Sequence, residues 1–200
     1  MFPLGAVLLP TLGLPLHIFE PRYRQLISDC LAGDSEFGVC LIERGSEVGG
    51  GEVRTNVGCV AQIVDAQEFP DGRWAVAAVG TRRIRILSWQ PDNPYPVADV
   101  EDWSDHAPTA DLGATRDLVV DQLRTVLSLQ HELVIAGPDV DTHIDADPII
   151  AGYQIAGLSP LGPFDRQLLL GAEDPGLRFH QLEVLLSDAE SDLRRQLDLR

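Results

Sequence analysis

The chain has 200 residues, which fit one large domain or two small ones, and its 44% hydrophobic content is sufficient for a core. It carries 15 basic and 31 acidic side chains, a formal net charge of −16, which argues against nucleic acid and anionic membranes as partners because both need clustered cations. All of its basic Lys and Arg side chains are arginines, and lysine is absent. This excludes Schiff-base lysines, Ser–Lys dyads and Walker lysines.

The first hundred residues have the pattern of a β-rich unit. Runs rich in β-branched residues predict strands at 37–42, 57–64, 74–79, 82–87 and 97–100. Pro70-Asp71-Gly72 supplies a turn between the second and third runs. Ile84 and Ile86 share one face of the fourth run, opposite its arginines. Short antiparallel strands of this kind favour a small closed or half-closed barrel.

One helix is expected within this unit. Pro21 suits the first helical position because it has no amide to leave unpaired, and Glu20 places a negative charge at the positive end of the helix dipole. An apolar stripe follows, and Gly33 ends the helix. The glycine-rich stretch 45–51 predicts a mobile loop.

The second half has the pattern of a helical bundle. A stretch rich in Asp, Ser, Thr, Pro and Ala at 102–113 indicates a linker, and the apolar period beyond it is about 3.6 residues. Asp147-Pro148 and Asp174-Pro175 each join a capping residue to a proline, so we expect helices to begin there, with a short helix at 164–170 between them. The two longer apolar stripes consist of Val119, Leu123, Val126, Leu127, Leu133 and Val134, and of Leu182, Leu185, Leu186, Ala189, Leu193 and Leu197. The sequence therefore predicts two domains, 1–104 and 105–200, the second ending in a long amphipathic helix.

A family resemblance rests first on the N-terminal run. This run contains Phe2-Pro3-Leu4, Val7-Leu8-Leu9-Pro10 and the ten residues LPLHIFEPRY at 14–23, and it resembles the opening of the substrate-recognition domain of Lon-type ATP-dependent proteases. The segment AVGTRRIRI at 78–86 is similar to the glycine-then-arginine strand of that family, and 147–151, 165–170 and 177–178 are similar to its helical half. The resemblance implies an α+β fold, with a β-rich, PUA-like pseudo-barrel that carries one helix followed by a C-terminal helical bundle.

The resemblance also implies a function without catalysis. We expect a polypeptide-binding module for unfolded or extended segments, acting as an adaptor for a protease or chaperone or as a holdase. The sequence lacks GxxxxGK[ST], and the chain stops at Arg200, where such a protease continues into its ATPase and peptidase parts, so we expect no enzymatic activity and no cofactor. The expected binding surface is the groove between barrel and bundle, with barrel edges available for strand addition.

The candidate peptide-binding residues are Phe19, Arg22, Tyr23, Trp74 and Trp103. In the functional interpretation, Arg22 and Tyr23 line the mouth of a peptide groove and an exposed tryptophan supplies an apolar contact. In the structural interpretation, Phe19 fills the barrel, Arg22 ties the helix to the sheet and the tryptophans belong to the core.

Two other functions stay open. A small-ligand or modified-nucleotide binder would need a deep pocket lined by an aromatic residue and by Arg82, Arg83 or Arg85. A structural oligomerisation unit would bury an apolar patch of the terminal helix in a symmetric homo-oligomer.

Metal, disulfide and membrane signals are weak. The loop 139–147 holds four carboxylates and a histidine but lacks the EF-hand glycine and terminal glutamate, so a solvated loop without metal is expected. Cys30, Cys40 and Cys59 are odd in number and form no CxxC pair. The N-terminus has no basic segment of a secretory signal, and a cytoplasmic protein is expected.

Overall fold

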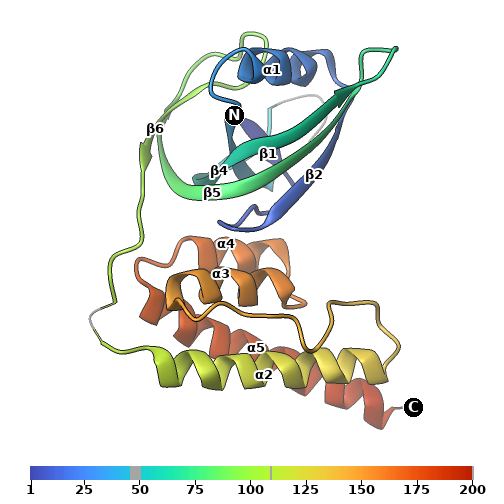
Figure 1. Ribbon diagram of the computed structural model, residues 1–200, viewed down its shortest axis with the longest axis vertical. Coiled ribbons are helices and arrows are strands. Elements are labelled where there is room, and N and C mark those ends of the chain that lie inside the picture. The colour runs from blue at the N-terminus through green and yellow to red at the C-terminus, as the bar shows by residue number, and fades with distance from the viewer. Residues whose placement is uncertain (46–50, 109, 200) are drawn as a thin grey trace. The chain divides into compact units, whose positions relative to one another are not determined.

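The computed structural model describes residues 1–45, 51–108 and 110–199 (Figure 1). The chain divides into two compact units, Met1–Ser104 and Asp105–Arg200, called unit 1 and unit 2 below. Unit 1 is β-rich and unit 2 is helical, so the predicted α+β class is confirmed. Most of the predicted mobile loop at 45–51 lies outside the described residues.

Unit 1 is built on one strongly curved sheet. Its elements are β1 (Phe2–Leu4), β2 (Gly13–Ile18), α1 (Pro21–Leu31), β3 (Glu36–Arg44), β4 (Val53–Glu68), β5 (Trp74–Trp89) and β6 (Ala98–Asp102). The strand order is β1-β3-β4-β5-β2, and β6 also pairs with β5. Only the β1–β3 pair is parallel among these described strands. Figure 1 shows β4 and β5 curving around the unit, with α1 across one end.

The hairpin between β4 and β5 forms where the sequence predicts it. Gly72 has a φ of 78°, a backbone conformation that glycine adopts without steric cost. The prediction of two separate strands at 74–79 and 82–87 is wrong. One strand, β5, continues through Gly80, with a register shift opposite Val60 and Ala61. A bulge of this kind bends a strand while keeping its pairing.

Glycine at position 80 is explained by close backbone packing. The segment before β2 crosses β5 here, where the Gly80 amide donates to the Leu12 carbonyl at 2.9 Å and the Thr11 amide donates to the Gly80 carbonyl at 2.7 Å. A Cβ atom on Gly80 would lie 2.3 Å from the carbonyl oxygen of Leu9. The glycine that the family resemblance singled out therefore permits this crossing.

The strands β1 and β2 form in a proline-containing run for which no strand is predicted from the sequence. Both lie at the ends of the main strand order. Proline is tolerated at such edges because its missing N–H is not needed by a neighbouring strand. Pro3 and Pro15 therefore do not prevent strand formation at these two positions.

The core of unit 1 lies inside the curved sheet beneath α1. Its buried members are Phe2, Leu4, Leu8, Ile18, Tyr23, Leu26, Ile27, Phe37, Val39, Cys59, Ala61, Ile63, Val76 and Ala78. Cys40 and Cys59 are buried, as expected for inert thiols, and burial raises the pKa of each to about 12.

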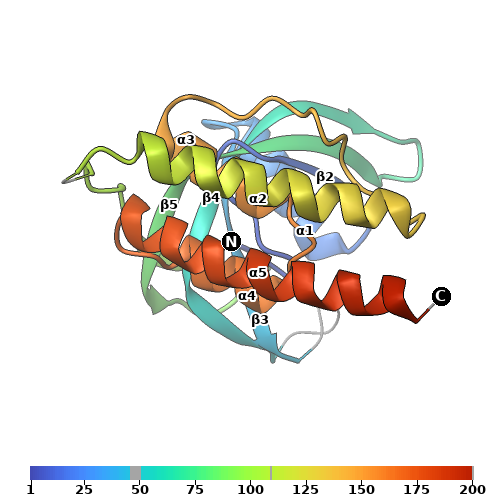
Figure 2. The same ribbon diagram turned by 90° about the horizontal axis from the view of Figure 1, so that it is seen from below.

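Unit 2 contains α2 (Gly113–Glu132), α3 (Pro148–Leu158), α4 (Pro163–Leu170) and α5 (Pro175–Asp198). The predicted starts of α3 and α5 are confirmed: Asp147 accepts a hydrogen bond from the Ile149 amide at 2.8 Å, and Asp174 accepts one from the Leu177 amide at 2.9 Å. The long helices α2 and α5 lie side by side (Figure 2).

The apolar stripes of α2 and α5 form most of the core of unit 2. Leu182, Leu186 and Leu193 of α5 are buried, as are the predicted stripe residues of α2 up to Leu133. Val134 is an exception, because it follows the helix with a φ of 60° and its side chain is 86% exposed. The leucine stripe of α5 is thus used inside unit 2.

A buried arginine links several segments of unit 2. The Arg178 guanidinium is fully buried and pairs with Asp105 at 2.6 Å. It also donates to the Tyr153 hydroxyl at 2.9 Å and to the Leu169 carbonyl at 3.1 Å. Tyr153 in turn donates to Asp105, and the Arg178 guanidinium lies 4.0 Å from the Tyr153 ring centroid. This cluster joins α3, α4 and α5 to the segment that precedes α2.

Candidate functional site

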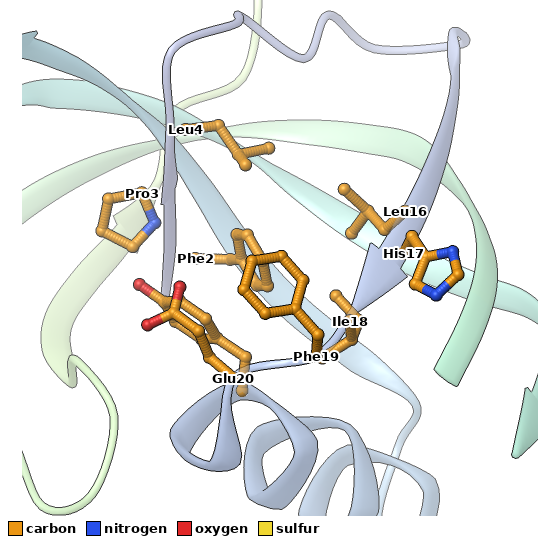
Figure 3. A pocket seen from close by; sticks show the side chains of 9 residues that line it. Phe2, Pro3, Leu4, Leu16, His17, Ile18, Phe19 and Glu20 are labelled. Atoms are coloured by element: carbon orange, nitrogen blue, oxygen red, sulfur yellow. The ribbon is translucent and has the colours of Figure 1, made fainter. Parts of the chain in front are cut away.

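A small apolar pocket lies in unit 1 between β1, β2 and the start of α1 (Figure 3). Its volume is about 130 Å³. The lining residues are Phe2, Pro3 and Leu4 of β1, Leu16, His17 and Ile18 of β2, and then Phe19, Glu20 and Tyr23. Figure 3 shows the side chains of Leu4, Leu16 and Ile18 projecting toward the space between the two strands, while His17 points away from it.

Stacked aromatic rings form the floor of this pocket. The Phe2 ring stacks on the Tyr23 ring, with ring centroids 4.1 Å apart. It is tilted against the Phe37 ring, with centroids 6.1 Å apart. Burial raises the pKa of Tyr23 to about 12, so its hydroxyl is neutral at physiological pH. The floor therefore consists of packed, uncharged rings.

Phe19 does not fill the barrel, and that structural prediction is wrong. Its side chain is 57% exposed, whereas Phe2 is 7% exposed and packs in the core. The difference follows from strand alternation, because Ile18 points into the core and the next residue points out of it. Phe19 is instead an exposed aromatic side chain at the rim of the pocket.

Arg22 does not line the pocket, but it contacts Glu20 and Tyr23, which do. Its Nε atom pairs with Glu20 at 3.1 Å, and its guanidinium lies 4.5 Å from the Tyr23 ring centroid. This ion pair joins two residues at the start of α1, and the predicted tie between the helix and the sheet stays a prediction. Phe19, Arg22 and Tyr23 are thus brought together, with Tyr23 buried beneath the rim.

The two candidate tryptophans lie elsewhere in unit 1. Trp74 is half-buried, pairs with Ile18 in the sheet and lines a different pocket with Arg24 and Glu68. Trp103 follows β6. The guanidinium carbon atoms of Arg83 and Arg85 lie 4.3 Å and 4.5 Å from the centroid of its ring. Neither tryptophan lines the pocket of Phe19.

Sequence reasoning missed six of the pocket residues, which are Phe2, Pro3, Leu4, Leu16, His17 and Ile18. The alternation of Leu14, Leu16 and Ile18 with Gly13, Pro15 and His17 is a two-residue period typical of a strand with one buried face. Pro15 obscures that signal, since proline normally argues against a strand.

The arginines required by the small-ligand alternative contact carboxylates or an aromatic ring. Arg82 makes two hydrogen bonds of 2.8 Å to Glu36 and a third of 3.0 Å to Asp102. Arg85 pairs with Glu101 at 3.4 Å, and Arg83 is buried against Trp103. These contacts give the small-ligand alternative no support.

The acidic loop at 139–147 uses its carboxylates locally. Asp139 accepts a hydrogen bond from the Asp141 amide at 3.0 Å, Asp145 accepts one from the Asp147 amide at 2.8 Å, and Asp147 caps α3. Within the described residues, no group of three or more His, Cys, Asp or Glu side chains is placed to hold a metal ion.

Comparison with known proteins identifies the family. The family model described as "ATP-dependent protease La (LON) substrate-binding domain" matches residues 1–188. The chain belongs to the Lon substrate-binding domain family. None of the described helices has the length and apolar character needed to span a membrane.

Solved structures of Lon N-terminal domains share this fold. The Lon N-terminal domain protein from Xanthomonas campestris is 30% identical with a TM-score of 0.65, over 92% of this chain and 95% of that chain. The N-terminal domain of the Mycobacterium avium complex Lon protease has a TM-score of 0.65 at 19% identity, over 95% of this chain and 97% of that chain. The second likeness concerns the fold alone.

Two curated relatives are longer proteins. Lon protease 2 of Herpetosiphon aurantiacus is 27% identical over 191 residues, which are 92% of this chain and 23% of that protein. The "LON peptidase N-terminal domain and RING finger protein C14F5.10c" of Schizosaccharomyces pombe is 28% identical over 104 residues, covering 46% of this chain and 21% of that protein. The Lon substrate-binding domain described here therefore spans less than a quarter of the length of these relatives.

Proposed function

We propose that this Lon substrate-binding domain is a non-catalytic module that binds unfolded or extended polypeptide segments at the pocket between β1 and β2. In this role it acts as an adaptor that passes clients to a protease or chaperone, or as a holdase. It needs no cofactor and works in the cytoplasm, where its three free cysteines stay reduced. The net charge of −16 disfavours nucleic acid and anionic membrane surfaces as partners.

The observation that carries the proposal is an apolar pocket beside an exposed aromatic side chain in a substrate-binding family. An apolar cavity of about 150 Å³ holds one benzene molecule. A pocket of about 130 Å³ is therefore suited to one apolar side chain of a client. Phe19, which is 57% exposed at its rim, supplies further apolar area that a bound segment would cover.

Binding to one small protein in two forms tests the proposal. The client is used native and permanently unfolded by reduction and carboxymethylation, and affinity is measured by fluorescence anisotropy. The wild-type chain is expected to bind the unfolded form at least about tenfold more tightly, because only that form exposes extended apolar segments. Equal affinity for the two forms, or no binding to either, contradicts the proposal.

Phe19→Ala is expected to weaken binding of the unfolded client about tenfold, because truncating an aromatic side chain that a bound segment covers commonly costs more than 1 kcal/mol. The matched control is Phe164→Ala in α4, since Phe164 is 61% exposed but lies in unit 2. The control is expected to bind within twofold of the wild type. If both variants lose affinity equally, the pocket is not the binding site.

A further inference from the structure

We propose that a client binds as an added β-strand on the free edge of β2 and inserts one apolar side chain into the adjoining pocket. This inference rests on the proposed function and specifies the form of the client. The occupant is an extended polypeptide, recognised through its main chain and through one side chain of limited size.

The register of β2 determines which of its backbone groups face the edge. The Gly80 amide donates to the Leu12 carbonyl, so Leu12 directs its carbonyl toward β5. From Gly13 to Ile18 the pairing with β5 continues without a shift. Because hydrogen-bonded and non-hydrogen-bonded pairs alternate along antiparallel strands, Leu14, Leu16 and Ile18 also bond β5.

The alternate residues, Gly13, Pro15 and His17, therefore direct their backbone groups away from β5. Pro15 fits this assignment independently, because a residue without an N–H is compatible with a position that does not bond the neighbouring strand. Among the described residues, β2 ends the main strand order with β5 as its one neighbouring strand. The N–H and C=O groups of His17 thus form the bonding pair at this edge beside the pocket.

The side chains agree with the backbone. Leu16 and Ile18 point inward and line the pocket, whereas His17 is exposed. In an added strand, the residue opposite His17 would exchange backbone hydrogen bonds with it and point outward. Its neighbours in the strand would lie opposite Leu16 and Ile18 and point inward.

This arrangement selects the chemistry of the occupant. Backbone N–H and C=O groups that alternate at a strand edge are matched by another strand. The pocket of about 130 Å³ then accepts a side chain of leucine size. A fitting client segment is extended and carries an apolar residue between outward-facing polar residues, a pattern that unfolded chains expose.

The decisive variants change the backbone or the side chain of His17 separately. His17→Pro removes the edge-facing N–H without removing a bond to β5, and Pro15 shows that β2 accommodates proline at such a position. His17→Ala removes the imidazole, which stacks on Phe69 at a centroid distance of 5.9 Å, but keeps the N–H. The probe is a fluorescein-labelled nine-residue peptide with one central leucine flanked by threonine and serine.

We expect His17→Pro to weaken peptide binding about tenfold or more, and His17→Ala to stay within twofold of the wild type. Replacing the peptide's leucine by aspartate should weaken binding to the same degree as His17→Pro. Circular dichroism verifies folding of each variant. If His17→Pro is not folded, binding of two ester-containing peptides to the wild-type chain is compared instead. In one peptide the ester replaces the N–H of the residue next to the leucine, which is expected to bond His17, and in the other it replaces the N–H of the leucine. The first ester must weaken binding more than the second.

The outcomes separate this inference from the proposed function. If the unfolded client and the peptide still bind His17→Pro normally, strand addition is overturned while polypeptide binding stands. Equal losses in both His17 variants also overturn it, because the imidazole would then be the contact. A wild-type chain that binds neither probe refutes both proposals. Light scattering that shows a dimer dissociated by His17→Pro would assign the β2 edge to a second copy of the chain and overturn the inference.

Discussion

Arg178→Met is expected to lower the free energy of unfolding of unit 2 by about 3–5 kcal/mol. The Arg178 side chain is fully buried and the Asp105 side chain is 9% exposed, so removing one partner leaves a buried charge without its counter-ion. The lost contacts to Tyr153 and Leu169 add to the penalty. Urea unfolding followed by the helical circular dichroism signal measures the change.

The matched control lies on the same helix. Arg194 of α5 pairs with Glu190 at 2.7 Å, but its side chain is 61% exposed. Arg194→Met is expected to change stability by less than about 1 kcal/mol, because exposed ion pairs contribute little. The double variant Arg178→Met/Asp105→Asn should cost less than the sum of its single variants. Additive losses, or equal effects at Arg178 and Arg194, would contradict the role assigned to the buried cluster.

Gly80→Ala is expected to lower the free energy of unfolding of unit 1 by about 1–3 kcal/mol, the usual cost of forcing atoms into a packed interior. The added methyl group would lie 2.3 Å from the Leu9 carbonyl oxygen and 3.1 Å from the Cys59 sulfur. The main-chain segment that leads from β1 to β2 would have to move away from β5. Urea unfolding followed by tryptophan fluorescence reports on this change, since Trp74 and Trp89 begin and end β5.

Gly13→Ala is the control for this substitution. No other atom lies within 4 Å of a Cβ at Gly13, which is also in a strand of unit 1. Its stability should be unchanged or slightly raised, because alanine reduces the conformational freedom of the unfolded chain. If Gly80→Ala is as stable as Gly13→Ala, close packing is not the reason for glycine at position 80.

Local signals were sufficient for the helices. Asp147 and Asp174 each precede a proline, and both act as N-caps where α3 and α5 begin. Capping depends on residues within one turn, so it can be read from a short stretch of sequence. Val134 shows the limit, because nothing in the apolar period indicated that the helix would end before it.

The edge strands and the pocket could not be predicted in the same way. Pro3 and Pro15 argue against strands unless their missing N–H groups face an edge, and edge position depends on the whole sheet. The stacking of Phe2 on Tyr23 likewise joins residues from β1 and α1. No local pattern singles out Arg178 as a buried ion-pair residue, since its partner Asp105 lies 73 positions earlier in the chain. Such long-range pairs leave no local pattern.

The proposed strand addition would determine how the module recognises its clients. Main-chain recognition at β2 would be independent of client sequence, and one pocket of limited size would add a weak preference for an apolar residue. Such a module would bind many unfolded segments but not native proteins, whose strands are already paired. This selectivity suits an adaptor or a holdase.

Residue-resolved amide hydrogen exchange, measured with and without an excess of the unfolded client, tests the central claim most directly. We expect the client to slow exchange of the His17 amide at least about tenfold, whereas exchange of the Leu14 and Leu16 amides, which are already bonded to β5, changes little. Protection confined to residues 105–199, or no change at His17 under saturating client, would contradict it.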